Sequence, residues 1–341
     1  MNKPTDFAYY LSKYLCNYLP NIKGVSNNTL KTYTATFKLF CQFMNCEKFI
    51  ITEKITLNEI TKEIILDFLE WIENTKNCCI NTRNQRLNVI RSFVRYIEIE
   101  SPKYMYECQN ILLIPKKKMA KKVIEFLSVD GINCLLNTPD KKTNIQRKHI
   151  VIMTLLYATA ARVSEIINLK ICDFKYNGNN LIKLTGKGNK SRLVPLEPAI
   201  IKLIEKYLIE QKEIRCIYDK SDYMFLNHSK DQLTRQGITY ILKKYIKIAN
   251  KNNPDLVSLN ISVHSLRHSR AIHWLQAGID LIYIRDLLGH VSVQTTEIYI
   301  RIDNKLKTQA LKNLSPENYP DANELLWHED KKLLEWLKTF S

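Results

Sequence analysis

Hydrophobic residues recur at three- and four-residue spacing along most of the chain, which is the pattern of amphipathic helices. Within the first 110 residues, the best-marked helix begins after Ser26 and gathers five side chains on one face, namely Leu30, Tyr33, Phe37, Phe40 and Met44. A second helix runs from Asn81 to about Glu98, and its apolar face consists of Leu87, Ile90, Val94 and Ile97. Strand-like alternation is scarce here, so the pattern predicts a helical N-terminal domain over residues 1–114.

Four arginines lie on the remaining faces of the second helix, and we expect them to project from it: Arg83, Arg86, Arg91 and Arg95. Guanidinium groups along one helix are suited to a DNA backbone. A solvated helix face explains them equally well, so their contact with DNA is a hypothesis.

The segment 115–123 interrupts the hydrophobic pattern and carries five lysines: Lys116, Lys117, Lys118, Lys121 and Lys122. A charged stretch without periodicity is typical of a linker, so we place a domain boundary here. A basic connector between two basic domains suits a clamp around a duplex, because attraction to phosphates persists in any linker conformation. The alternative is a solubilising spacer.

The second domain, from residue 124, is predicted to be helical around one β-hairpin. A helix is expected from Thr154 to Leu169. Two short β-rich runs, Leu181–Leu184 and Leu193–Leu196, are joined by a turn with lysine at its tip. From Val263 three helices follow, with helix ends and starts marked by Gly278, Asp280, Gly289 and Ser292.

The charge of the chain favours an anionic partner. It has 51 Lys and Arg against 34 Asp and Glu, which gives a net charge of +17. Many basic proteins bind no nucleic acid, so charge alone does not assign DNA binding. The nine cysteines form no pattern of zinc ligands and are interpreted as thiols in a reducing compartment. The sequence shows neither an export signal nor a long apolar run, so we expect a cytoplasmic protein.

Reactive side chains gather near the C-terminal end of the second domain. His264 and Arg267 are three residues apart on a predicted helix and therefore share a face, which suits a phosphate site. His290 follows in Leu-Gly-His, and Tyr299 follows nine residues later. A tyrosine hydroxyl can break a phosphodiester and store the bond as a phosphate ester. A neighbouring base or a strong positive field must help to remove its proton, because the unperturbed pKa of a phenol is about 10.

These residues resemble the signature of the tyrosine recombinase family. The family pattern has an early Arg, a hairpin Lys, His-x-x-Arg, Leu-Gly-His and a Tyr, and every position is matched here: Arg162, Lys187, His264, Arg267, His290 and Tyr299. The resemblance spans roughly residues 25 to 306 and is close to the Xer and transposon-integrase branches. Two departures are Ala160, where the family often has Gly, and Arg270, where it often has an aromatic residue.

The resemblance implies a mainly α fold with a small antiparallel hairpin, arranged as a two-domain C-shaped clamp. It further implies a helical core-binding domain of the SAM-like type over 1–114 and a catalytic domain over 124–306. Tyr299 would form a 3′-phosphotyrosyl bond, with Arg162 and Arg267 on the phosphate. Lys187 would protonate the 5′ oxygen, His264 would assist proton transfer and His290 would hold the phosphate. Lys190 and Arg192 are further candidates for DNA contact. No cofactor or metal is expected.

The tail over 307–341 ends in an amphipathic stretch with Leu333, Trp336, Leu337 and Phe340 on one face. The face packs on its own domain or docks in a neighbouring protomer, which the resemblance implies for a tetramer on two DNA sites. The free protein is expected to be a monomer.

Three other functions stay open at this stage: a type IB topoisomerase, a DNA-binding protein without activity, and a zinc or magnesium hydrolase. The sequence does not distinguish chromosome dimer resolution, transposon movement and phage integration.

Overall fold

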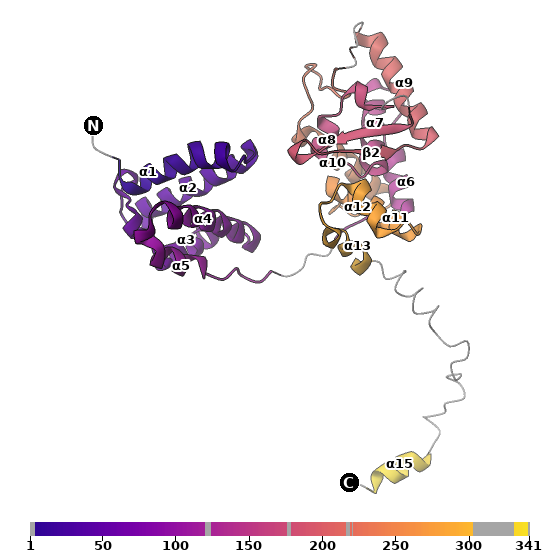
Figure 1. Cartoon of the computed structure of the whole chain (residues 1–341). Coiled ribbons are helices and arrows are strands. Elements are labelled where there is room, and N and C mark those ends of the chain that lie inside the picture. The colour runs from indigo at the N-terminus through magenta and orange to yellow at the C-terminus, as the bar shows by residue number, and fades with distance from the viewer. Residues whose placement is uncertain are drawn as a thin grey trace. The chain divides into compact units, whose positions relative to one another are not determined.

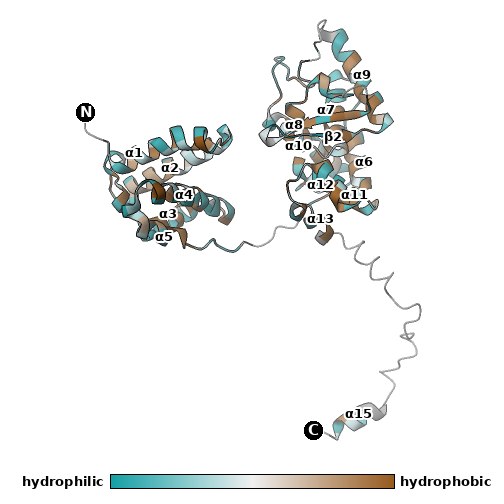
Figure 2. Ribbon diagram, viewed as in Figure 1, coloured by the Kyte–Doolittle hydropathy of each residue, from teal (hydrophilic) through white to brown (hydrophobic). Residues whose placement is uncertain are grey.

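The computed structural model describes residues 4–119, 124–175, 179–215, 219, 221–302 and 331–339. By the contacts between Cα atoms, the chain divides into two compact units, Met1–Lys122 and Val123–Ser341. Figure 1 labels the helices and strands of both units, and each unit has its own hydrophobic core. Hydrophobic positions concentrate where the helices of a unit pack together (Figure 2).

The N-terminal unit is helical throughout its described part. Its elements are α1 (Asp6–Lys13), the π-helix η1 (Tyr14–Ile22), α2 (Asn27–Glu47), η2 (Thr52–Lys54), η3 (Leu57–Glu59), α3 (Lys62–Asn74), α4 (Ile80–Glu100), η4 (Pro102–Tyr104) and α5 (Met105–Leu112). Ser26 caps α2 by accepting from the Thr29 N–H, which confirms the predicted helix start. Aromatic rings fill the core, with Phe7, Phe37 and Tyr14 all packed on Phe93 of α4.

The chain that leaves the N-terminal unit is tied to α4 before it reaches the rest of the linker. Asn84 exchanges two hydrogen bonds with the backbone of Lys117, at 2.9 and 3.1 Å. Arg83 donates to the Pro115 carbonyl and Arg91 to the Ile114 carbonyl. The first residues of the expected linker, through Lys117, are therefore held by the N-terminal unit.

This arrangement corrects the expectation that all four arginines project from the second helix. Arg83 is buried, and Arg86 turns inward to the carbonyl of Thr32 and the hydroxyl of Thr36. The carbonyls of Thr32, Ile114 and Pro115, which belong to other segments, accept hydrogen bonds from these guanidinium groups. Such bonds are favoured because an unpaired carbonyl inside the protein is costly. Arg95 is the one of the four that is exposed.

The C-terminal unit surrounds a two-stranded antiparallel sheet with helices. Its elements are α6 (Val129–Asn137), α7 (Asn144–Ala158), α8 (Val163–Ile167), η5 (Ile171–Asp173), β1 (Leu181–Thr185), η7 (Lys187–Asn189), β2 (Ser191–Pro195), α9 (Pro198–Arg215), α10 (Arg235–Asn252), α11 (Val263–Gln276), α12 (Leu281–Leu288), η8 (Val293–Thr295) and α13 (Glu297–Ile302). Leu181 pairs with Pro195 and Thr185 with Ser191, which confirms the predicted hairpin. A further helix, α15 (Lys331–Lys338), follows in the tail.

The core of this unit fixes the hairpin and the helices that carry the candidate catalytic residues. Ile182, Leu184 and Val194 turn one face of the hairpin into the main core. A smaller cluster lies beside that core and contains Ala160, Ala271, Ile272, Trp274, Ile284, Leu288 and Tyr299. The mainly α fold with a small hairpin, expected from the sequence, is thus confirmed. Among the described residues, no helix is long and apolar enough to cross a membrane.

Candidate active site

Arg162 stands at a break between two helices. The sequence predicts one helix from Thr154 to Leu169, and this prediction is wrong: α7 ends at Ala158 and α8 begins at Val163. Ala160 in the break has a φ of 49°, a left-handed conformation that ends a helix and favours glycine. Arg162 caps α8 in extended conformation, so its side chain is turned out of the helical run.

Glu165 joins two arginines in a buried ion-pair cluster. Arg162 donates from its backbone N–H to Glu165 Oε2 at 2.8 Å and from Nη1 to Oε1 at 2.9 Å. Arg192 of β2 donates to both carboxylate oxygens, at 2.8 and 2.9 Å. Burial by itself would raise the pKa of Glu165, but the hydrogen bonds and charge of the arginines hold it below its ordinary value. Glu165 is therefore ionised and orients both guanidinium groups.

Arg267 is almost fully buried and bridges two segments through their carbonyls. Its Nη1 donates to Ala160 O and its Nη2 to Leu288 O, both at 2.6 Å. Burial, followed by the charges of Arg162 and Arg192, lowers its pKa to about 10. It remains charged at neutral pH, and the two bonds use two of the five N–H donors of its guanidinium group. Arg267 thus fixes the end of α12 against the α7–α8 break.

The two histidines of the signature lie near this group of arginines. His264 is exposed near the start of α11, whereas His290 is partly buried just after Gly289. His290 Nδ1 lies 3.0 Å from the hydroxyl of Thr296. Burial and then the charges of Arg267, Arg162 and Arg192 lower the pKa of His290 to about 4. Although the residue as a whole is exposed, partial loss of hydration at its ring, followed by the charges of Arg267, Arg235 and Arg162, also lowers the pKa of His264. Both rings are therefore neutral at pH 7.

Tyr299 is enclosed, with 1% of its surface exposed. Its ring packs in the cluster around Ala271 and Leu288, and its hydroxyl lies 3.0 Å from Nδ1 of His268. Burial raises the pKa of Tyr299, while the charges of Arg267 and Arg162 oppose that rise. Burial and the neighbouring His264 and Arg267 lower the pKa of His268 to about 4, so this ring is a neutral hydrogen-bond partner.

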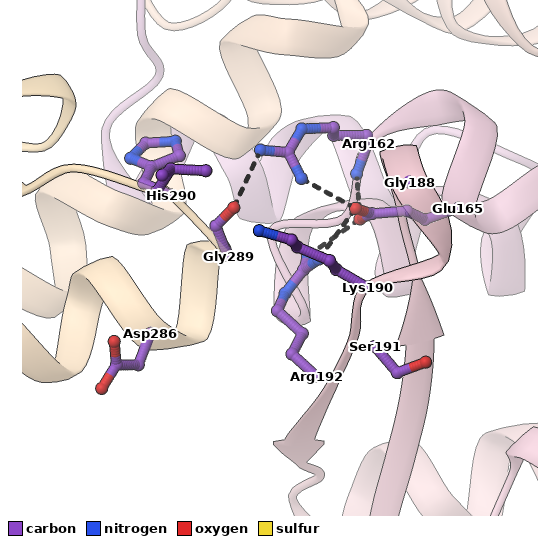
Figure 3. A pocket seen from close by; sticks show the side chains of 10 residues that line it. Arg162, Glu165, Gly188, Lys190, Ser191, Arg192, Asp286, Gly289 and His290 are labelled. Carbon is purple, nitrogen blue, oxygen red and sulfur yellow. Dashed lines mark hydrogen bonds and ion pairs between the residues drawn. The ribbon is translucent and has the colours of Figure 1, made fainter. Parts of the chain in front are cut away.

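A pocket of about 780 Å³ opens beside the arginines (Figure 3). Arg162 and His290 lie on its wall, and the exposed Lys190 of the hairpin extends toward Arg162 and Gly289. Arg162 Nη2 donates to Gly289 O at 3.2 Å, which links the two sides. The turn η7 brings the backbone of Lys187 to the hairpin tip, while its side chain lies outside the described part. The pocket thus offers cationic groups to an anion such as a phosphate.

The other candidates for DNA contact are the lysines at the end of the N-terminal unit and Arg192 of the hairpin. Lys116, Lys117 and Lys118 are exposed, and Lys117 pairs with Glu73 at 2.6 Å. Lys121 and Lys122 lie outside the described residues. Arg192 lines the pocket, yet its side chain is 11% exposed and its hydrogen bonds go to protein groups. This placement favours a structural role over a direct phosphate contact.

The tail residues are only partly described. Trp336 and Leu337 of α15 are exposed. The side chains of Leu333 and Phe340 lie outside the described part.

Two residues of this site, Glu165 and His268, are not among the catalytic candidates that the sequence identifies. Glu165 was detectable, because it stands three residues after Arg162, which is the spacing at which a glutamate in the first helical turn accepts from the backbone N–H of the capping residue. The contact of His268 with Tyr299 joins residues 31 apart, which only the fold reveals. In the described ranges, no group of three His, Cys, Asp or Glu side chains is placed to hold a metal ion.

Comparison with known proteins connects this geometry to a family. Residues 125–305 match the phage integrase family, and residues 13–101 match the phage integrase N-terminal SAM-like domain. Tyrosine recombinase XerD of Listeria monocytogenes is 31% identical over 301 residues, which are 88% of this chain and 95% of that protein.

Two solved structures share the fold. XerH site-specific recombinase bound to palindromic difH substrate has a TM-score of 0.66 at 21% identity, with 88% of this chain and 84% of that chain covered. The Tn1549 transposon integrase in complex with transposon right end DNA has a TM-score of 0.70 at 12% identity, with 89% and 97% covered.

Proposed function

The chain belongs to the phage integrase family of tyrosine recombinases, enzymes that cut and rejoin DNA strands, and we propose that it does so through a covalent bond from Tyr299 to DNA. Site-specific recombination is its activity, and the proposal concerns which residues perform it. The supporting observation is that four separate segments bring Arg162, Arg267, His290 and Tyr299 into one electrostatic group. The charges of Arg267 and Arg162 act on the phenol of Tyr299 and oppose the rise of its pKa that burial causes.

The first step is the attack of the Tyr299 oxygen on a phosphorus atom of the DNA backbone. The phenol proton passes to a neutral histidine, for which His264 and His268 are the candidates. The P–O5′ bond breaks as the new P–O bond forms, and Lys187 gives a proton to the departing 5′ oxygen. Charge that grows on the non-bridging oxygens is stabilised by Arg162, Arg267 and His290.

The second step reverses the first with a different nucleophile. A free 5′ hydroxyl attacks the phosphotyrosine, returns a proton to the tyrosine oxygen and restores a phosphodiester. One phosphate ester is exchanged for another at each step, so the bond energy is conserved. The reaction therefore needs no nucleotide hydrolysis.

Tyr299 is enclosed in the protein without DNA, so under this proposal the free protein is in a resting form. Strand cleavage requires the segment around α13 to move until the hydroxyl faces a phosphate in the pocket. Binding of DNA is the natural source of the required free energy, since the pocket is lined by cationic groups that a phosphate would engage.

A nicked suicide substrate tests this proposal. On such DNA, cleavage releases a short strand and traps the covalent adduct. Tyr299→Phe should retain DNA binding and lose the adduct, because only the attacking oxygen is removed. An adduct that persists in Tyr299→Phe would assign the reaction to another residue. Relaxation of supercoiled DNA without a specific site would instead favour a topoisomerase.

Assembly and biological setting extend the same proposal. Residues 1–114, the linker over 115–123 and residues 124–306 would close on DNA as a C-shaped clamp. Four protomers would act on two sites in the cytoplasm and exchange strands through a Holliday junction. The tail over 307–341 would dock in a neighbouring protomer. The likeness to the tyrosine recombinase XerD supports this proposal of site-specific recombination.

A further inference from the structure

Arg192 makes an unusually complete set of contacts for a residue on a short β-hairpin. Its Nη1 and Nη2 donate to the two oxygens of Glu165, and its Nε donates to Leu287 O at 2.7 Å. The side chain therefore ties β2 to α8 in one direction and to the end of α12 in the other. Figure 3 shows its side chain running behind Lys190 to the carboxylate of Glu165.

The surrounding backbone is shaped to admit this side chain. Gly289 has a φ of 63°, and a Cβ at that position would lie 3.1 Å from Cδ of Arg192. On the opposite strand side, a Cβ at Gly186 would lie 3.0 Å from Oε1 of Glu165. Both glycines thus permit a close approach between the backbone and the Arg192–Glu165 pair. Gly186 directly precedes Lys187 in the chain.

Glu165 connects Arg192 to Arg162, the arginine that we propose binds the phosphate. The same Oε1 that accepts from Arg192 also accepts from Arg162 Nη1, and Arg162 Nη2 reaches Gly289 O. The hairpin, the α7–α8 break and the His290 loop therefore meet in a single hydrogen-bonded cluster. The main core holds one face of the hairpin through Ile182, Leu184 and Val194, and the cluster adds polar contacts from Arg192, next to the tip, to α8 and to the end of α12.

We propose that Arg192 is a positioning residue, which seats the hairpin tip that carries Lys187 against Arg162 and the His290 loop. It contacts no DNA in this role. Arg192 thereby holds Lys187, the proton donor for the 5′ oxygen, in a fixed position relative to Arg162, which binds the phosphate. The proposal rests on the proposed function of Lys187, and it replaces the sequence-based hypothesis that Arg192 binds DNA.

The test compares an ordinary nicked suicide substrate with one that has sulfur in place of the bridging 5′ oxygen. A thiolate leaves without protonation, since the pKa of a thiol is about 8.5 and that of an alcohol is far higher. Arg192→Gln should slow adduct formation at saturating DNA about 10- to 100-fold on the oxygen substrate, with DNA affinity changed less than about threefold. Sulfur should recover most of the lost rate. Arg192→Lys, which keeps the charge but not the bidentate contact, should fall between Arg192→Gln and the unaltered protein.

Arg147→Gln is the matched control. Arg147 also donates to a carboxylate, that of Glu210, and to the backbone carbonyls of Lys141 and Lys142. It lies near the start of α7, whereas the Arg192 cluster lies beyond the end of this helix. Its loss should leave the cleavage rate and the response to sulfur unchanged. Thermal unfolding of each variant identifies those that fold, and Arg192→Lys carries the comparison if Arg192→Gln does not fold.

Two results would overturn the proposal. Weaker DNA binding with an unchanged rate at saturation would make Arg192 a phosphate contact. A slower rate that sulfur does not recover would show that Arg192 does not act through the hairpin. Lys187→Ala separates these failures from a failure of the proposed function: if sulfur fails to rescue Lys187→Ala as well, Lys187 is not the proton donor.

Discussion

The enclosure of Tyr299 leads to a prediction about its reactivity before DNA is bound. Burial of a tyrosine ring removes about 150–250 Å² from water, which at about 25 cal/mol per Å² corresponds to about 4–6 kcal/mol. The hydrogen bond to His268 contributes about 1 kcal/mol more. Since about 1.4 kcal/mol is a factor of ten, the free protein should expose Tyr299 in fewer than about one molecule in 1,000. His268→Ala should raise that population about fivefold.

Nitration of tyrosines, read at each peptide by mass spectrometry, measures this exposure. Tyr106 and Tyr283 are 80% and 68% exposed and serve as references for a free ring, while Tyr14 is 0% exposed and serves as the enclosed reference. In the free protein Tyr299 should react as slowly as Tyr14, and a specific DNA site should accelerate it. If Tyr299 reacts as fast as Tyr283 without DNA, the resting position described above is not the one in solution.

Three further predictions concern stability. Glu165→Ala should lower the free energy of unfolding by about 3 kcal/mol, because it leaves the buried guanidinium group of Arg192 without its carboxylate, while that of Arg162 is partly exposed and can be solvated, and thermal or urea unfolding would measure the loss. His149, His268 and His290 have folded pKa values lowered to about 4, so each takes up a proton on unfolding between pH about 6.5 and 4. Stability should therefore be full above pH 6.5 and fall below it, by up to about 1.4 kcal/mol per pH unit for each histidine, and a flat urea midpoint over that range would contradict the lowered values. Asn84→Ala should free the start of the linker and speed trypsin cleavage at Lys116 to Lys118, whereas an unchanged cleavage rate would mean that the contact does not hold the chain.

Structural features that depend on neighbouring residues were predicted from the sequence, whereas features that depend on contacts between distant residues were not. Local signals located α2, the hairpin and the helix ends at Asp280 and Gly289, because caps and turns depend on neighbouring residues. The break at Ala160 was missed, since alanine is a strong helix former and tertiary contacts impose its left-handed conformation. Family resemblance, together with the spacing of His264 and Arg267, selected the candidate catalytic residues without three-dimensional information.

Contacts between segments that are distant along the chain could not be predicted from the sequence. The inward course of Arg83 and Arg86 could not be read from the helix pattern, because the carbonyls that bind them belong to other parts of the chain. In the same way Arg192 looked like one more basic residue on a hairpin. Its partner Glu165 lies 27 positions earlier, and only folding places the two side chains together.

The central claim is that the oxygen of Tyr299 becomes bonded to a DNA phosphate. Its most direct test is to trap the adduct on a nicked suicide substrate, digest the protein and the DNA, and locate the nucleotide by mass spectrometry. The account predicts a 3′-phosphate linked to the peptide that contains Tyr299. A nucleotide on any other residue, or a linkage through the 5′ end of the DNA, would contradict it.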